Sequence, residues 1–320
     1  MELLEAKDAA RRPLVAVVGP TGSGKSALAL HLCHSLDGEI VNCDSIQLYR
    51  FFDIGAAKDP PEARQGIPHH LIDILDPDQV FTAGEYARRG RIVLDEISRR
   101  GKLPVVVGGT GFYLRALIDG LFPGPRRDDN VRRRLLDRES RKPGALHRML
   151  CRLDPPSAKQ IHVNDVPKTI RALEVRLLTG RPLSDWFAVD RDALEGYRIL
   201  KLGLSPDRDS LYARLNERLV RMFESGLAGE VRAILARGYS PDAKPFESLG
   251  YRQALQLVRG EINLHNAIFY AQRDTRNYAK RQLTWFRSDP AVVWIRGFGE
   301  DPAVHETALS HIRKFLVPES

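Results

Sequence analysis

Residues Gly19–Ser26 read Gly-Pro-Thr-Gly-Ser-Gly-Lys-Ser and match the phosphate-binding pattern G-x-x-x-x-G-K-[ST] in full. The glycines allow successive backbone amides to turn inward around a phosphate, and the helix that follows points its positive dipole end at the same place. Lys25 adds a charge for the terminal phosphate, and the Ser26 hydroxyl is placed to hold Mg²⁺. We therefore predict phosphate contacts from Gly19, Pro20, Thr21, Gly22, Ser23, Gly24, Lys25 and Ser26.

A second glycine-rich loop, Gly108–Gly111, follows the apolar run Leu103–Val107. In a motor ATPase or a GTPase, a strand at this point would end in an Asp that binds magnesium. Gly108-Gly109-Thr110-Gly111 offers backbone amides and one hydroxyl, and it contains no carboxylate. This argues against an ordinary NTPase and favours a P-loop fold adapted to group transfer.

Asp44 follows another predicted strand, Glu39–Cys43, at the carboxyl edge where parallel α/β sheets bind ligands. Its carboxylate has the chemistry of a general base or a metal ligand. The alternative is a capping role, because Asp before a helical run is common. For His69 and His70 we expect no metal pair, because adjacent side chains on a strand point to opposite faces.

The elements around these motifs predict an α/β fold, a P-loop NTPase-like parallel sheet flanked by helices. A strand at Leu14–Val18, the phosphate loop, a helix to about Leu36 and the strand Glu39–Cys43 form a unit typical of parallel sheets. Further strands are predicted at Leu103–Val107, Tyr197–Leu204 and Ala291–Ile295. Helices are predicted at Thr82–Arg100, Phe112–Ile118, Asp209–Ser225, Leu227–Arg237, Ser248–Arg259 and Asn263–Arg287, with a short one at the end of the chain.

Between residues 121 and 198, proline and glycine residues separate short helical stretches that are rich in Arg and Leu. We interpret 121–198 as a small helical insertion domain. The core domain would then comprise 13–120 and 199–320, preceded by an N-terminal tail at 1–12.

The net charge of +8 is concentrated in two places. Arg126–Arg152 holds ten Arg or Lys against four Asp or Glu, and Ala271–Arg287 holds five against one. Two basic segments on a nearly neutral chain favour nucleic acid as a partner over a uniformly solvated surface.

The remaining composition indicates a soluble, cytoplasmic protein. There is no run of eighteen apolar residues for a membrane span, and the polar N-terminus lacks the apolar region of a secretory signal. Cys33, Cys43 and Cys151 cannot all pair, which indicates a reducing compartment. No heptad seam or large apolar patch predicts a dimer, so we expect a monomer.

The last long predicted helix has an amphipathic pattern. Arg273, Arg276, Lys280 and Arg287 share one stripe, and Ala279, Leu283 and Phe286 lie on the next. Trp285 can stack on a base or pack in the core, and the core is the commoner place for such a ring.

Together these segments resemble the tRNA dimethylallyltransferase family, also called tRNA isopentenyltransferase. The resemblance runs from about Pro13 to Trp294. It rests on GPTGSGKS (Gly19–Ser26), DSIQLY (Asp44–Tyr49), DIGAAK (Asp53–Lys58), HHLID (His69–Asp73), GGTGFYLRAL (Gly108–Leu117), NDVPKTIRALEV (Asn164–Val175), LGYRQ (Leu249–Gln253) and TRNYAKRQLTWFR (Thr275–Arg287).

The resemblance implies that the P-loop binds dimethylallyl diphosphate and that the dimethylallyl group moves to N6 of the adenosine at tRNA position 37, next to the anticodon. It implies that Lys25, Thr110, Arg132 and Mg²⁺ on Ser26 neutralise the departing diphosphate. Asp44 resembles the family residue that takes the proton from the adenine amine.

The resemblance also implies a set of contacts to the anticodon stem-loop. These are Asp44, Ser45, Ile46, Gln47, Thr110, Arg132, Pro167, Lys168, Thr169, Ile170, Arg171, Lys280, Arg281, Gln282, Leu283, Thr284, Trp285, Phe286 and Arg287.

Three alternatives remain open from the sequence. An adenylate isopentenyltransferase would share the P-loop, Asp44 and the Gly108–Gly111 loop but would prenylate free AMP, ADP or ATP. A small-molecule kinase would instead transfer a phosphoryl group from ATP. An RNA-binding module with a vestigial P-loop would not need Lys25 for its function.

Overall fold

The computed structural model describes residues 11–186 and 189–317, so the predicted tail at 1–12 lies almost entirely outside the described residues. The chain divides into two compact units. The sheet unit is formed by the residues up to Leu117 together with those from Glu195 onward, and the helical unit is Ile118–Leu194. The insertion domain predicted at 121–198 overlaps this second unit.

The sheet unit is built on a six-stranded sheet in the order β3-β2-β4-β1-β5-β6, with every neighbouring pair parallel. The strands are β1 (Arg12–Val18), β2 (Gly38–Asn42), β3 (His69–His70), β4 (Leu103–Val107), β5 (Tyr197–Leu204) and β6 (Val292–Ile295). The predicted parallel α/β fold and its five predicted strands are confirmed. The sequence missed β3, because a strand of two residues is too short to show a periodic pattern.

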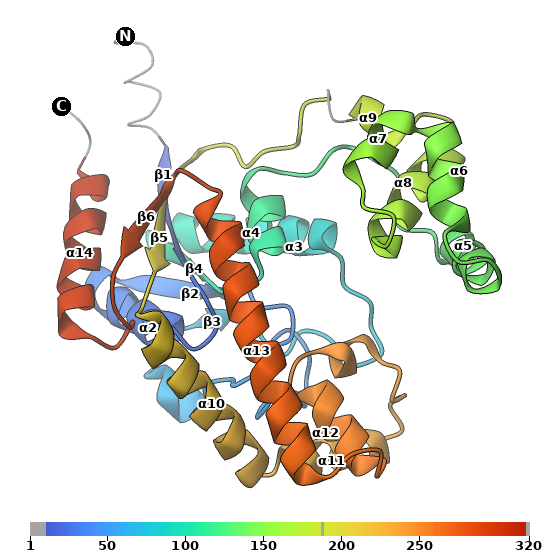
Figure 1. Cartoon of the computed structure of the whole chain (residues 1–320). Coiled ribbons are helices and arrows are strands. Elements are labelled where there is room, and N and C mark those ends of the chain that lie inside the picture. Colours follow the sequence, from blue (N-terminus) through green and yellow to red (C-terminus); the bar gives the residue numbers. More distant parts are fainter. Residues whose placement is uncertain (1–10, 187–188, 318–320) are drawn as a thin grey trace. The chain divides into compact units, whose positions relative to one another are not determined.

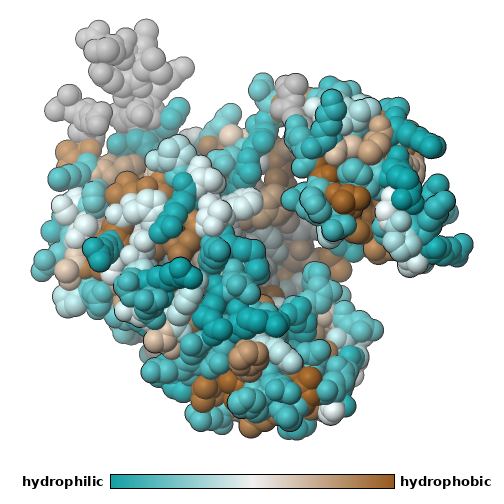
Figure 2. Space-filling model, in the orientation of Figure 1, coloured by the Kyte–Doolittle hydropathy of each residue, from teal (hydrophilic) through white to brown (hydrophobic). Residues whose placement is uncertain are grey.

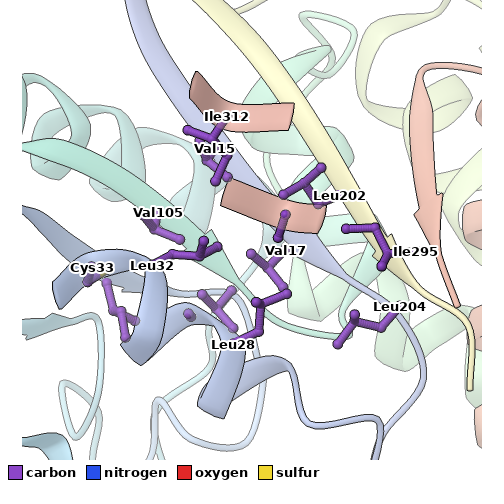
Figure 3. Close-up of a cluster of buried hydrophobic side chains, with 14 of the residues drawn as sticks. Val15, Val17, Leu28, Leu32, Cys33, Val105, Leu202, Leu204, Ile295 and Ile312 are labelled. Carbon is purple, nitrogen blue, oxygen red and sulfur yellow. The ribbon is translucent and has the colours of Figure 1, made fainter. Parts of the chain in front are cut away.

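Strand β1 lies in the middle of the sheet, and its residues Leu14–Val18 are each at most 1% exposed. A strand covered on both faces needs a continuous apolar run, which is what this sequence supplies. On one face, Val15 and Val17 pack with Leu28 and Leu32 of α2 (Lys25–Leu36) and with Ile312 of α14 (Pro302–Leu316), as Figure 3 shows.

Further helices pack near the sheet and its carboxyl edge. Helix α3 (Ala83–Arg99) packs against β2 and β4, and its Tyr86 hydroxyl donates to the Asn42 carbonyl at 2.9 Å. Helix α4 is Gly111–Ile118, and two short 3-10 turns lie at Pro61–Arg64 and Lys244–Glu247.

The C-terminal helices form a group in which α13 packs against α10 and α12, and α11 packs against α12 (Figure 1). Their bounds are α10 (Arg208–Glu224), α11 (Leu227–Ala236), α12 (Tyr251–Val258) and α13 (Leu264–Arg287). The predicted stripes on α13 are confirmed in part, because Ala279 and Phe286 are buried and Arg273, Lys280 and Arg287 are exposed.

The helical unit has a core of its own. It contains α5 (Asp129–Arg141), α6 (Ala145–Leu153), α7 (Pro155–Gln160), α8 (Val166–Thr179) and α9 (Leu183–Trp186) around a cluster that includes Leu146, Leu150 and Leu173. Buried Asp154 caps α7, accepting from the Ser157 amide at 3.2 Å and hydroxyl at 2.6 Å, and it accepts from the Ser184 amide at 3.1 Å. None of the described helices is long and apolar enough to span a membrane.

Candidate active site

The phosphate-binding loop lies between the end of β1 at Val18 and the start of α2 at Lys25. Gly22 and Gly24 have φ of 76° and 84°, in the left-handed region that glycine adopts without strain. A Cβ on Gly24 would lie 2.6 Å from the backbone nitrogen of Gly299, which is too close for a larger residue without a backbone shift. Gly24 provides no side-chain cap and the first turn of α2 has no acidic residue, which leaves the positive end of the helix open to an anion.

Two polar side chains of this loop fit an anionic ligand. The Ser23 hydroxyl is buried without a hydrogen-bond partner among the described residues. Lys25 donates from Nζ to the Pro20 carbonyl at 2.6 Å, and burial lowers the pKa of its ammonium to about 8 although Asp44 opposes the shift. Ser26 is exposed at the start of α2.

The loop opens into a cavity of about 1030 Å³ within the sheet unit. Its lining includes Lys25 and Ser26 from α2, the segment Asp44–Gln47 after β2, and Gly108 and Gly109 after β4. The carboxyl ends of neighbouring parallel strands therefore bring together the motifs that the sequence singled out separately.

Asp44 uses one carboxylate oxygen to close the turn after β2. Its Oδ1 accepts from the Ile46 amide at 2.9 Å and from the Gln47 amide at 3.4 Å. The capping alternative is thus realised in the structure, although the chain forms a turn here instead of a helix. Oδ2 has no hydrogen bond to any described residue, and Asp44 lines the cavity, so this oxygen is available to accept a proton.

Thr110, in the second glycine loop, is hydrogen-bonded to the residues on either side of Asp44. Its Oγ1 accepts from the Ser45 amide at 3.1 Å, and its own amide donates to the Cys43 carbonyl at 3.2 Å. Tyr278 of α13 lines the same cavity, and burial raises the pKa of its phenol, with Asp44 adding to the shift. The Asp44 turn and the second glycine loop are therefore fixed relative to each other.

Helix α10 brings three arginines to the cavity that the sequence reading missed, Arg214, Arg218 and Arg221. Arg214 pairs with Glu300, from Nη2 to Oε1 at 2.5 Å and from Nη1 to Oε2 at 3.1 Å. Arg218 lines the cavity without a hydrogen bond or ion pair to any described residue. Burial lowers the pKa of this guanidinium and Asp44 raises it. The i, i+4 spacing of Arg214 and Arg218 is the sequence signal that could have found this face of the helix.

The predicted RNA contacts on α13 differ in how far their side chains are exposed. Gln282 is only 5% exposed and both ends of its carboxamide are hydrogen-bonded, and Phe286 is buried, so neither offers its side chain to a partner. Leu283 is half-buried. The side chains that remain exposed along this stretch are Lys280, Arg281, Thr284, Trp285 and Arg287. In Figure 2 the surface along α13 is mostly hydrophilic.

The expectation that Trp285 is a core residue is wrong, because its ring is 40% exposed. The ring covers Gly111, where a Cβ would lie 2.2 Å from it, and the Arg115 guanidinium lies 6.0 Å from the ring centroid. The indole is thus partly accessible to solvent.

The predicted contacts on α8 of the helical unit also include both buried and exposed side chains. Thr169 and Ile170 are buried, and the Thr169 hydroxyl donates to the Asp165 carbonyl at 2.9 Å, so these two side chains are structural. Pro167 and Lys168 are exposed at the start of the helix.

Arg132 and Arg171 hold the buried carboxylate of Glu174. Arg132 donates from Nε and Nη2 at 2.8 and 3.0 Å, and Arg171 donates from Nη1 at 2.7 Å. Burial opposes ionisation of Glu174, yet these hydrogen bonds lower its pKa to about 2. Both arginines have a structural partner, and a diphosphate contact for Arg132 stays a prediction.

His69 and His70 make separate contacts on β3. His69 Nδ1 lies 2.8 Å from the Ile67 carbonyl, and His70 Nε2 lies 2.6 Å from Glu39. Within the described ranges, no group of three or more His, Cys, Asp or Glu side chains could hold a metal.

Comparison with known proteins identifies the relatives of this chain. The profile of the IPP transferase family matches residues 47–289. A tRNA dimethylallyltransferase from Solibacter usitatus is 64% identical over 95% of this chain and 99% of its own length. The chain belongs to the IPP transferase family. It is therefore a prenyl-transferring enzyme, as the sequence predicted.

Solved structures of related enzymes have the same fold. The full-length tRNA isopentenylpyrophosphate transferase from Bacillus halodurans matches with a TM-score of 0.69 and 37% identity, over 95% of each chain. A eukaryotic dimethylallyltransferase acting on tRNA matches with a TM-score of 0.77 and 29% identity, over 94% of this chain and 77% of that one. The family profile begins at Gln47, so the phosphate loop and Asp44 lie outside the match, whereas the Solibacter relative aligns over nearly the whole chain.

Proposed function

We propose that this transferase moves a dimethylallyl group from dimethylallyl diphosphate to N6 of the adenosine at tRNA position 37. The observation that carries the proposal is one cavity that holds an open phosphate loop, an unpartnered cation at Arg218 and a carboxylate oxygen free to accept a proton. Enzymes of this family from other organisms are named for acting on tRNA.

In the reaction, the allylic carbon–oxygen bond of the donor breaks and the adenine nitrogen forms a bond to that carbon. Negative charge grows on the leaving diphosphate, so the barrier falls where fixed positive groups face it. We assign this task to the loop amides, Lys25 and Arg218, with Thr110 near the bridging oxygen.

Mg²⁺ is the cofactor we propose for this step. The Ser26 hydroxyl is a hard oxygen donor of the kind Mg²⁺ accepts, and it lines the same cavity as the phosphate loop. Few protein ligands suffice, because Mg²⁺ in such sites is bound largely by substrate phosphates and water. Bound there, the ion would neutralise charge on the diphosphate.

The adenine amine is a weak nucleophile, because its lone pair is delocalised into the ring. Holding it in line with the allylic carbon is therefore part of the catalysis. As the new bond forms, the nitrogen must lose a proton, and Oδ2 of Asp44 is the acceptor we assign.

The target base stacks in the anticodon loop and must be extruded to reach the cavity. Exposed cations on α13 and on the helical unit would hold the anticodon stem-loop through its phosphates, with Trp285 available to stack on a base. We propose that the enzyme works as a monomer in the cytoplasm, where its tRNA substrate is found.

Nucleoside analysis by mass spectrometry tests the proposal. Unmodified tRNA and AMP are offered side by side with dimethylallyl diphosphate and Mg²⁺. We expect N6-dimethylallyladenosine in the digested tRNA and unchanged AMP. Prenylated AMP with unmodified tRNA would establish the adenylate alternative instead, and ADP release from ATP would point to a kinase.

A further inference from the structure

One side chain of α13 joins the two glycine loops of the cavity. The Oε1 atom of Gln282 accepts from the Thr21 amide of the phosphate loop at 2.8 Å. Its Nε2 atom donates to the Gly109 carbonyl of the second loop at 2.9 Å. The two loops follow neighbouring strands, β1 and β4, and Gln282 connects them from a helix more than 170 residues further along the chain.

The contact is specific for a glutamine of this length. The carboxamide must accept on one side and donate on the other, which a carboxylate cannot do. A Cβ on Gly109 would lie 2.0 Å from Nε2, so the loop approaches the amide as closely as glycine allows. Because Gln282 is only 5% exposed, water has little access to replace either hydrogen bond.

We propose that Gln282 is a positioning residue that fixes the phosphate loop against the second glycine loop and so sets the geometry in which the loop amides meet the diphosphate. The inference rests on the proposed function, since it takes diphosphate as the ligand of the cavity. Gln282 is not among the residues that line the cavity, and its side chain contacts the backbone of Thr21 and Gly109.

Loss of this link has a defined consequence. Without it, the amides of the phosphate loop are no longer held in one arrangement, and binding must then order them at a cost in affinity. The effect therefore falls on diphosphate binding and on the KM for the prenyl donor more than on the affinity for tRNA.

Two substitutions at this position test the proposal. Gln282→Met keeps the length of the side chain and removes both hydrogen bonds, whereas Gln282→Glu keeps the acceptor for Thr21 and loses the donor to Gly109. We expect about tenfold weaker binding of inorganic diphosphate, measured by calorimetry, and a similar rise in the KM for dimethylallyl diphosphate. The fall in kcat should be smaller than the rise in KM.

Gln253→Met is the matched control. Gln253 is also buried, at 1% exposed, and it also makes two hydrogen bonds, accepting from the Gly250 amide at 3.0 Å and donating to Asp274 at 3.0 Å. This variant should lower the melting temperature by a similar amount and leave diphosphate affinity unchanged.

The outcomes separate this inference from the proposed function. If both Gln282 variants bind diphosphate as the wild type does, or if Gln253→Met weakens binding equally, the positioning role is wrong. If the wild-type protein itself binds no diphosphate and prenylates no tRNA, the proposed function fails and the inference fails with it.

Discussion

Asp44 combines a structural and a chemical task in one carboxylate, and a substitution can separate them. Asp44→Asn keeps an oxygen that accepts from the Ile46 amide, so the turn after β2 is preserved. A carboxamide cannot take up the proton of the amine, so we expect kcat to fall at least about a hundredfold. Steady-state kinetics and tRNA filter binding, done on the same preparations, would show the loss in turnover with unchanged tRNA affinity.

Asp44→Ala provides the comparison, because it removes the turn as well as the base. We expect a lower melting temperature for this variant than for Asp44→Asn. Full turnover in Asp44→Asn, or a loss of tRNA binding as large as the loss of rate, would assign Asp44 to positioning alone.

The lowered pKa of Lys25 predicts that diphosphate binding depends on pH. Burial lowers the pKa of its ammonium to about 8, whereas bound diphosphate favours the charged form and raises that pKa again. Above pH 8 binding must therefore take up a proton, and the affinity should fall by up to about tenfold per pH unit. Below pH 8 Lys25 is already protonated and makes no such contribution.

Calorimetric titration with inorganic diphosphate between pH 6.5 and about 9.5 measures this slope. Lys25→Arg is the control, since a guanidinium stays charged over the whole range and the ionisation of diphosphate is common to both proteins. Parallel pH profiles for the two proteins would exclude Lys25 as the titrating group.

At the scale of elements, the sequence predicted strands better than side-chain roles. β1 and β4 are short, continuous apolar runs before glycine loops, a pattern that identifies buried parallel strands. Gln282 was predicted as an RNA contact only through the family resemblance, and its burial was not foreseen because its neighbours Lys280, Arg281 and Arg287 are exposed cations. Its partners are backbone groups of two distant loops, and no local pattern reveals such a contact.

Helices α5 and α6 line a groove of about 740 Å³ that carries a second cluster of cations. Arg134, Arg138, Arg141, Lys142 and Arg152 line it without an ion pair to any described residue. We expect the double variant Arg138→Ala, Arg141→Ala to raise the KM for tRNA and to reduce the slope of log affinity against log salt by about 1.5 to 2. The KM for dimethylallyl diphosphate should not change.

Arg99→Ala is a suitable control for this measurement. Arg99 is also an exposed helical arginine, but it pairs with Asp95 and lies in the sheet unit. An unchanged salt slope in the α5–α6 double variant would mean that the groove does not contact tRNA phosphates.

At the scale of the whole molecule, the two basic segments found in the sequence belong to different units. Arg126–Arg152 lies in the helical unit, and Ala271–Arg287 lies on α13 of the sheet unit. Composition alone could locate the charge, but it could not show that all the lining of the larger cavity comes from the sheet unit. Phosphate binding and part of the RNA binding are thus expected to be separable.

A deletion variant tests this separation. The amide of Leu194 donates to the Ile118 carbonyl at 2.8 Å, so the chain enters and leaves the helical unit at adjacent points. Each unit has its own buried cluster, so about four Gly and Ser residues in place of Ile118–Leu194 should leave the sheet unit folded. Diphosphate affinity should stay within about twofold, because every residue that lines the phosphate cavity belongs to the sheet unit and is kept. The affinity for tRNA should fall at least about tenfold, because the cations of α5 and α6 are gone.

Cooperative thermal unfolding establishes that the shortened chain is folded before either ligand is titrated. Undiminished tRNA binding would place RNA recognition on the sheet unit alone, and lost diphosphate binding in a folded protein would show that the phosphate loop depends on the helical unit.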